Sequence, residues 1–332
     1  MRSLIYLLIV SLAGLPVSIL AADEVVVYSA RKEHLIKPLF EAYEKETGVK
    51  VKYITDKAGP LLQRLKAEGK RSPADILMTV DAGNLWHAAE AGVLEETQSE
   101  LLDKNVPAHL KDPQNRWFGI TVRARTIVYN KDKVKPEELS GYEALSDEKW
   151  KGRLCLRTSK KVYNQSLVAM LLSRHGQQKT SEIVSGWVNN LALPPFSNDT
   201  KTMQAVSSGQ CDVSIVNTYY FGRLEKKNPQ TNLALFWSNQ DSSGVHVNVS
   251  GAGITRYSKH KKQARQLLEW LVSEKAQSML ADLNMEYPVN TNVAVPAQVK
   301  NWGNFSADDI NLTEAGRLQA DAVKLMDISG YR

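Results

Sequence analysis

The run Trp117-Phe-Gly-Ile-Thr-Val-Arg-Ala-Arg-Thr-Ile-Val-Tyr-Asn130 gives the strongest indication of how this chain folds. It is rich in β-branched and apolar residues, which is typical of a strand, but it is too long for one flat strand. Arg123 and Arg125 lie in its middle, and the alternation of side chains along a strand places both on one side. A strand that crosses from one lobe to another, with two cations at the crossing, explains this run.

Helices and strands alternate on both sides of the crossing run. Before it, we expect strands at 24–28, 49–54 and 74–80, and helices at 34–46, 60–68 and 84–91, with Asp81 as a helix N-cap. After it, we expect strands at 153–157, 211–216 and 251–255, and helices at 165–175, 180–191, 200–208 and, as one long helix or a pair, 260–283. This order predicts an α/β protein whose sheets are covered by helices on both faces.

The length of the chain also favours two lobes, because a single hydrophobic core rarely serves about 310 residues. Each lobe is expected to hold a mixed, mainly parallel sheet flanked by helices, with a ligand cleft between the lobes. We expect an N-terminal lobe of residues 23–122 plus about 250–300, and a C-terminal lobe of residues 123–249 plus about 301–332.

The first 22 residues have the pattern of a signal peptide. Arg2 supplies the positive charge, Leu4 to Leu20 is apolar, and Ala21-Ala22 offers small residues for cleavage. The apolar stretch approaches the length of a membrane anchor, which is the alternative. No cysteine stands at the cleavage point, so no lipid anchor is expected. We expect a cleaved signal peptide and a protein of the periplasm without a stable membrane anchor.

Composition and motifs exclude several classes of function. The net charge of +6 falls to +5 without Arg2, and the basic residues are spread along the chain, which disfavours nucleic acid as a partner. The chain has no G-x-S-x-G elbow and no P-loop, so we expect a protein that is not an enzyme. Cys155 and Cys211 predict a disulfide in an exported protein, with free thiols as the alternative.

Two adjacent tyrosines, Tyr219 and Tyr220, point to the chemistry of the protein. They follow a predicted strand, and Asn217-Thr218 before them is typical of a helix N-cap, so both are expected in a first helical turn. Phenol oxygens are hard donors that suit a highly charged cation such as Fe(III), which can displace their protons. The alternative is a pair of ordinary half-buried aromatic residues.

The chain resembles the periplasmic ferric-ion-binding proteins, the substrate-binding components of Fe(III) ABC importers, over nearly its whole mature length. The motifs that carry the resemblance are Tyr28-Ser-Ala-Arg31, Ser72-Pro-Ala-Asp-Ile-Leu77, Thr79-Val-Asp-Ala-Gly83, Arg123-Ala-Arg-Thr-Ile-Val-Tyr129, Trp150-Lys-Gly-Arg153, Val162-Tyr-Asn-Gln-Ser-Leu167 and Asn217-Thr-Tyr-Tyr220. The resemblance implies a two-lobed periplasmic binding protein fold of type II and a transferrin-like iron site.

The resemblance also implies roles for particular residues. Tyr163, Tyr219 and Tyr220 match tyrosinate ligands of the family, and Arg123 matches an arginine that holds a synergistic anion such as carbonate. Relatives often place His or His-Tyr where this chain has Lys32-Glu33, so Glu33 becomes the candidate ligand of the first lobe, with a helix N-terminal acid as the alternative. Arg125 is a second candidate for the anion, and a hinge salt bridge is the alternative for both arginines.

These observations lead to one expected function and one alternative. The first is a monomeric periplasmic protein that captures Fe(III), with or without a small anion, and delivers it to an ABC permease in the inner membrane. The alternative is a periplasmic binding protein for a small anion or a polyamine, in which the tyrosines form cleft walls.

Overall fold

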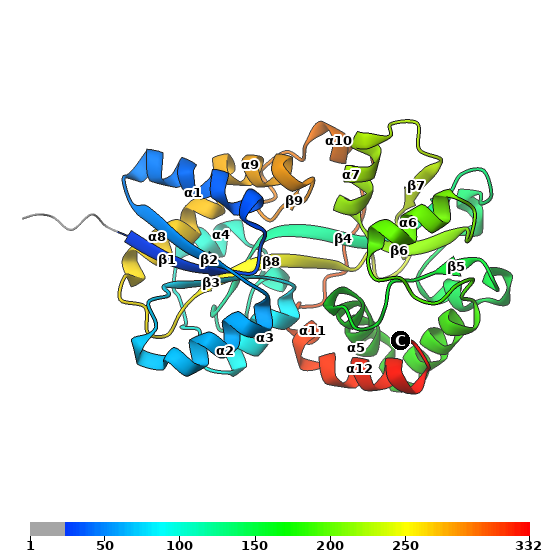
Figure 1. Cartoon of the computed structure of the whole chain (residues 1–332), viewed down its shortest axis with the longest axis horizontal. Helices are drawn as coiled ribbons and strands as arrows, with labels where there is room; N and C mark the ends of the chain where they lie inside the picture. The colour runs from blue at the N-terminus through cyan, green and yellow to red at the C-terminus, as the bar shows by residue number, and fades with distance from the viewer. Residues whose placement is uncertain (1–23) are drawn as a thin grey trace, which may run out of the picture.

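The computed structural model describes residues 24–332, and the predicted signal peptide lies outside them. The described chain forms two lobes side by side, and the long strands β4 (Phe118–Asn130) and β8 (Val247–Ile254) run from one lobe into the other (Figure 1). Within residues 24–332, no helix is both long and apolar enough to cross a membrane. The predicted two-lobed α/β architecture is confirmed.

The elements alternate as the sequence predicts. The other strands are β1 (Glu24–Ser29), β2 (Lys50–Thr55), β3 (Ile76–Val80), β5 (Leu154–Cys155), β6 (Val213–Asn217), β7 (Leu233–Phe236) and β9 (Tyr287–Pro288). The helices are α1 (Glu33–Thr47), α2 (Ala58–Glu68), α3 (Ala82–Glu90), α4 (Glu100–Asn105), α5 (Val162–Asn189), α6 (Asp199–Ser207), α7 (Thr218–Lys227), α8 (Lys261–Leu271), α9 (Glu274–Asn284), α10 (Ala297–Lys300), α11 (Thr313–Arg317) and α12 (Gln319–Ile328).

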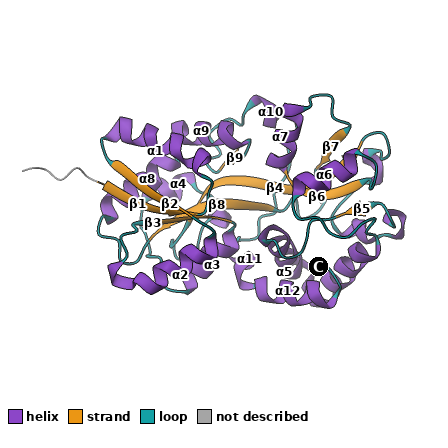
Figure 2. Ribbon diagram, viewed as in Figure 1, coloured by secondary structure: helices purple, strands orange, loops and turns teal. Residues whose placement is uncertain are grey.

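The sheet has the strand order β2-β1-β3-β8-β4-β6-β5, and β7 and β9 also pair with β4. Neighbours are parallel at β1–β2, β1–β3 and β5–β6, where helical crossovers connect them, and antiparallel along β4 and β8. The crossing strands pair antiparallel because one leaves the first lobe and the other returns to it. Helices cover both faces of the sheet in each lobe (Figure 2).

The strand β4 changes partner at the two arginines. Up to Arg123 and Ala124 it pairs with β8, and from Arg125 onward it pairs with β6. All of its residues are buried. The predicted crossing between lobes is therefore confirmed at Arg123–Arg125, and it places both guanidinium groups at the junction of the lobes.

Separate hydrophobic cores stabilise the two lobes. Helix α1 contributes to the first core because its apolar residues recur on one face, and it ends where Gly48 adopts φ 75°. Cys155 and Cys211 form a disulfide in the second lobe, so the predicted pairing is confirmed and the free-thiol alternative is not.

The C-terminal segment divides between the lobes. Helix α11 packs against both α3 and α5, and its Ala315 belongs to the core of the first lobe. Helix α12 packs against α5, and its Leu325 belongs to a core of the second lobe. The segment near the C-terminus therefore ties the lobes together on the side of α3 and α5 (Figure 1).

Candidate functional site

Tyr219 and Tyr220 occupy the first turn of α7, as the sequence predicts. Strand β6 ends at Asn217 and the helix begins at Thr218, so the chain turns just before the pair. The two rings lie with their centroids 4.4 Å apart at 34°. Tyr219 is buried and Tyr220 is half-buried. The Arg223 guanidinium, one turn later, lies 5.1 Å from the Tyr219 ring centroid and 5.8 Å from that of Tyr220.

The side chain of Asn217 has a different role from the predicted N-cap. It makes no capping hydrogen bond to α7. Its Oδ1 accepts a hydrogen bond of 3.1 Å from Arg125, and its Nδ2 donates to the Tyr219 hydroxyl group at 3.4 Å. Asn217 therefore links the crossing strand to Tyr219, and it helps to orient that phenol.

Tyr163 approaches the pair from a second helix. It lies in the first turn of α5 and is half-buried. The guanidinium groups of Arg123 and Arg157 lie 5.6 Å and 5.2 Å from its ring centroid. Tyr163 and Tyr219 lie close enough for each to influence the pKa of the other. The structure thus brings together the three predicted tyrosines from two helix N-termini.

The environment of Tyr219 and Tyr163 favours the neutral form of both phenols. Burial raises the pKa of Tyr219 well above its ordinary value, and the neighbouring Tyr163 and Tyr220 raise it further. Burial also raises the pKa of Tyr163, although the positive charge of Arg123 opposes this shift. A cation must therefore displace protons from buried phenols, which a highly charged ion does best.

The two predicted arginines differ in how many protein partners they have. Arg125 donates to Asn164, Asp199, Asn217 and the carbonyl of Ile215, so protein groups already engage its guanidinium. The ion pair of Arg125 with Asp199 is consistent with the alternative for this residue, a salt bridge at the hinge.

Arg123 is less completely engaged. It donates to Ser250 Oγ at 2.8 Å and to the Val249 carbonyl at 2.7 Å, and it lies 3.8 Å from Glu286. Its buried Nε has no hydrogen-bond partner among the described residues. Arg123 therefore has one donor that no described protein group uses.

Glu33 makes no described contact with Tyr163, Tyr219 or Tyr220. It is exposed at the start of α1, and its carboxylate accepts a hydrogen bond of 2.9 Å from the Tyr53 hydroxyl group. Among the described residues, no cluster of three or more His, Cys, Asp or Glu residues has a geometry suited to a metal ion. The tyrosines are thus the candidate metal ligands that the fold gathers.

Sequence reasoning missed other charged residues that adjoin the tyrosines. Arg157 follows β5 and shares Asp199 with Arg125. Glu286 binds Arg31 at 2.9 Å and lies beside Arg123. The position of Arg157 at the carboxyl end of a strand parallel to β6 was a usable signal, because such ends line the cleft. Glu286 offered no local signal.

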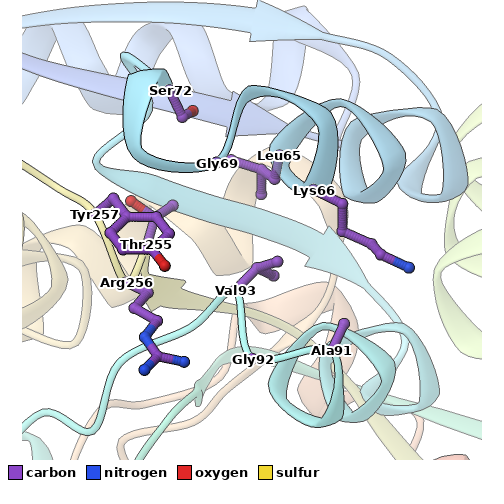
Figure 3. Close-up of a pocket in the computed structure, with 10 residues that line it drawn as sticks. All are labelled: Leu65, Lys66, Gly69, Ser72, Ala91, Gly92, Val93, Thr255, Arg256 and Tyr257. Atoms are coloured by element: carbon purple, nitrogen blue, oxygen red, sulfur yellow. The ribbon is translucent and has the colours of Figure 1, made fainter.

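A cavity in the first lobe holds none of the predicted site residues. It has a volume of about 310 Å³, between α2, the end of α3 and the segment after β8 (Figure 3). Its lining residues are Leu65, Lys66, Gly69, Ser72, Ala91, Gly92, Val93, Thr255, Arg256 and Tyr257. It does not contribute to the tyrosine site.

Two lobes, crossing strands and buried polar groups at the junction define a two-lobed solute-binding protein. The family model of bacterial extracellular solute-binding proteins matches residues 71–311, and this chain belongs to that family.

Known relatives extend over nearly the whole chain. Iron uptake protein A1 of Synechocystis sp. is 45% identical over 316 residues, which cover 93% of this chain and 88% of that protein. Among solved structures, the Trichodesmium protein IdiA or FutA in complex with iron and citrate ligands has a TM-score of 0.90 and 42% identity, covering 93% of this chain and all of that one. The ferric iron-binding protein A of Mannheimia haemolytica in an open conformation has a TM-score of 0.88 and 38% identity, covering 93% of this chain and 99% of that one.

Proposed function

We propose that this protein binds Fe(III) through the phenolate oxygens of Tyr163, Tyr219 and Tyr220 and delivers it to an ABC permease. The observation that carries the proposal is the meeting of these tyrosines at two helix N-termini, beside Arg123. The similar proteins are named as iron uptake or ferric iron-binding proteins, which favours iron over the small-anion or polyamine alternative. They are binding proteins, and we propose no catalytic role.

The chemistry of the three phenols suits a trivalent ion. Three phenolates neutralise the charge of Fe(III), and the N–H groups at the starts of α5 and α7 add positive potential that stabilises the phenolates. We propose that a carbonate or another small anion binds at the free Nε of Arg123 and fills part of the coordination sphere.

Closure of the lobes completes the proposed site. The strand β4 changes its pairing partner at Arg123–Arg125, which supports a lobe boundary at residue 123. We propose that the N-terminal lobe precedes this boundary and that the C-terminal lobe begins there. We propose that a hinge motion at this boundary brings the first lobe over the tyrosines, with Glu33 as a ligand that must leave Tyr53 to reach iron. The protein is proposed to act as a periplasmic monomer after its signal peptide is cleaved.

Titration of the purified protein with Fe(III) tests this function. We expect a visible tyrosinate-to-iron charge-transfer band that saturates at one iron per protein. Tyr219→Phe and Tyr220→Phe should each lower iron affinity at least about a hundredfold, because each removes a charged ligand. Tyr257→Phe is the control, since Tyr257 is exposed and distant from the tyrosine cluster. Unchanged affinity in both site variants rules the proposed function out.

A further inference from the structure

Two residues that are unfavourable for their local backbone meet beside the tyrosine pair. Gly222 lies in the interior of α7, two residues after Tyr220, and glycine is a poor helix former. Met285 ends α9 in the left-handed conformation, with φ 53° and ψ 42°. Glycine is the usual residue at such a helix end, because the backbone crowds a side chain there. Each position thus holds the kind of residue that the other would favour.

The left-handed conformation of Met285 is unusual for its residue type. Among the described residues other than glycine, four have a positive φ, and the other three are Asp81, Asn115 and Asn239. Asp and Asn tolerate this conformation because their short polar side chains form local hydrogen bonds, which methionine lacks. Met285 is nevertheless buried. Packing of its side chain therefore offsets an unfavourable backbone.

The packing partner of Met285 is Gly222. A Cβ atom added at Gly222 would lie 2.8 Å from the Met285 Sδ and 2.8 Å from the Trp302 ring, closer than such atoms approach without strain. The absence of a side chain at Gly222 lets both residues contact the backbone of α7. Gln298 of α10 also donates a hydrogen bond of 2.9 Å to the Gly222 carbonyl. Residues 285–302 therefore form a seat for the helix that carries the tyrosine pair.

The contact between Met285 and Gly222 joins the two lobes. Met285 belongs to the first lobe, because α9 packs against α1 and β4, and the neighbouring Glu286 pairs with Arg31 at 2.9 Å. Helix α7 follows β6 in the second lobe. Arg223 of α7 donates a hydrogen bond to Asn284, next to Met285. The first turns of α7 are thus held by residues that are fixed to the other lobe.

We propose that Met285 is a positioning residue for iron binding. Its contact with Gly222 sets the place of the first turn of α7, so the first lobe controls where Tyr219 and Tyr220 lie relative to Tyr163. This inference rests on the proposed function, since the tyrosines must hold the iron. A role in stability alone is the competing explanation, so the experiment separates iron binding from stability.

Substitutions on both sides of the contact test the proposal. Gly222→Ala introduces the crowded Cβ, Met285→Ala removes the side chain, and Met285→Leu keeps its apolar volume. Gly186→Ala is the matched control, because a Cβ there would lie 2.4 Å from the Ser146 Cβ, beyond the break of α5 at Gly176. Urea denaturation measures stability, competition with a chelator measures iron affinity, and the charge-transfer band reports the geometry at iron.

The expected results distinguish positioning from stability. Gly222→Ala and Met285→Ala should each lower iron affinity about tenfold and shift the maximum of the band, whereas Met285→Leu should lose less affinity than Met285→Ala. Gly186→Ala should lose stability but keep the affinity and the band of the wild type.

Three outcomes overturn the positioning role alone. They are an unchanged affinity and band in both Gly222→Ala and Met285→Ala, an equal loss of affinity in Gly186→Ala, and equal affinities of Met285→Ala and Met285→Leu. The last comparison decides the matter even when Gly222→Ala does not fold. Absence of the band in the wild type overturns the proposed function instead.

Discussion

The carboxylate of Asp81 accepts a hydrogen bond of 2.7 Å from the hydroxyl group of Ser166, and this bond joins the two lobes. Asp81 precedes α3 in the first lobe, and Ser166 lies on α5 of the second, one turn after Tyr163. Asp81 also caps α3 through Gly83 N, as the sequence predicts, and accepts from Asn248. Its φ of 76° is a left-handed conformation that costs an aspartate about 1–3 kcal/mol, and these three hydrogen bonds offset that cost.

Removal of the Ser166 hydroxyl group should therefore weaken the contact between the two lobes. A hydrogen bond to a buried carboxylate contributes about 1–2 kcal/mol, so Ser166→Ala should speed iron release about tenfold. Stopped-flow mixing of the iron-loaded protein with a strong chelator measures this rate. Ser181→Ala, farther along α5 and half-buried, is the matched control. Equal release rates for the two variants would contradict the role of this bond in holding the lobes together around iron.

Arg123 and Arg125 should respond differently to the same substitution. Arg125→Gln removes one of the two arginines that pair with the buried Asp199 and leaves it with Arg157 at 3.3 Å and the Asn217 N–H at 3.0 Å, so we expect a loss of about 3 kcal/mol in the free energy of unfolding. Arg123→Gln removes the charge that lowers the pKa of Tyr163, so iron affinity should fall about tenfold. Urea denaturation and iron titration of both variants measure the two effects. A larger stability loss in Arg123→Gln than in Arg125→Gln would reverse this assignment.

The contrast between these arginines shows what the sequence can and cannot predict. The crossing strand and the first-turn position of Tyr219 and Tyr220 were predictable because both depend on local spacing. Arg123 and Arg125 lie on the same side of the crossing strand, so the sequence pattern cannot tell their roles apart. The contact of Arg125 with Asp199, which depends on the tertiary fold, distinguishes them. The pairing of Arg31 with Glu286 spans 255 residues, so no local pattern could reveal it.

Iron affinity should fall as the pH falls. Since the raised pKa values of Tyr163 and Tyr219 keep both phenols protonated in the free protein, iron binding releases their protons. Each released proton changes the affinity about tenfold per pH unit at fixed Fe(III) activity. Competition with a chelator of known pH dependence measures this slope between pH 6 and pH 8. Tyr163→Phe should lower the slope by about one, and an unchanged slope would exclude Tyr163 as a ligand that loses a proton.

The Cys155–Cys211 disulfide should stabilise the lobe that carries the tyrosines. It joins β5 to the segment before β6, across a sequence separation of 56 residues. A loop of this length corresponds to about 4 kcal/mol of stabilisation through the entropy of the unfolded chain. Cys155→Ala/Cys211→Ala should lose about this much free energy of unfolding in urea. Dithiothreitol should destabilise the wild type similarly but leave the double variant unchanged; an equal effect on both would show that the disulfide is not the cause.

His246 should make the protein less stable in mild acid. It is buried at the junction of the lobes, its backbone binds Arg125 and Tyr142, and its Nδ1 has no hydrogen-bond partner among the described residues. Burial lowers its pKa from 6.5 to about 4, and Arg125 and Arg123 act in the same direction while Asp308 opposes them. Between these two values the unfolded chain binds a proton that the folded protein does not, so stability is fully present above pH 6.5 and declines as the pH falls toward 4. The loss amounts to about 3 kcal/mol.

Urea denaturation at pH 7 and pH 4.5 should show a smaller difference in the free energy of unfolding for His246→Gln than for the wild type. His34→Gln, an exposed control, should behave like the wild type. An identical pH dependence in all three proteins would mean that His246 is not the group that titrates.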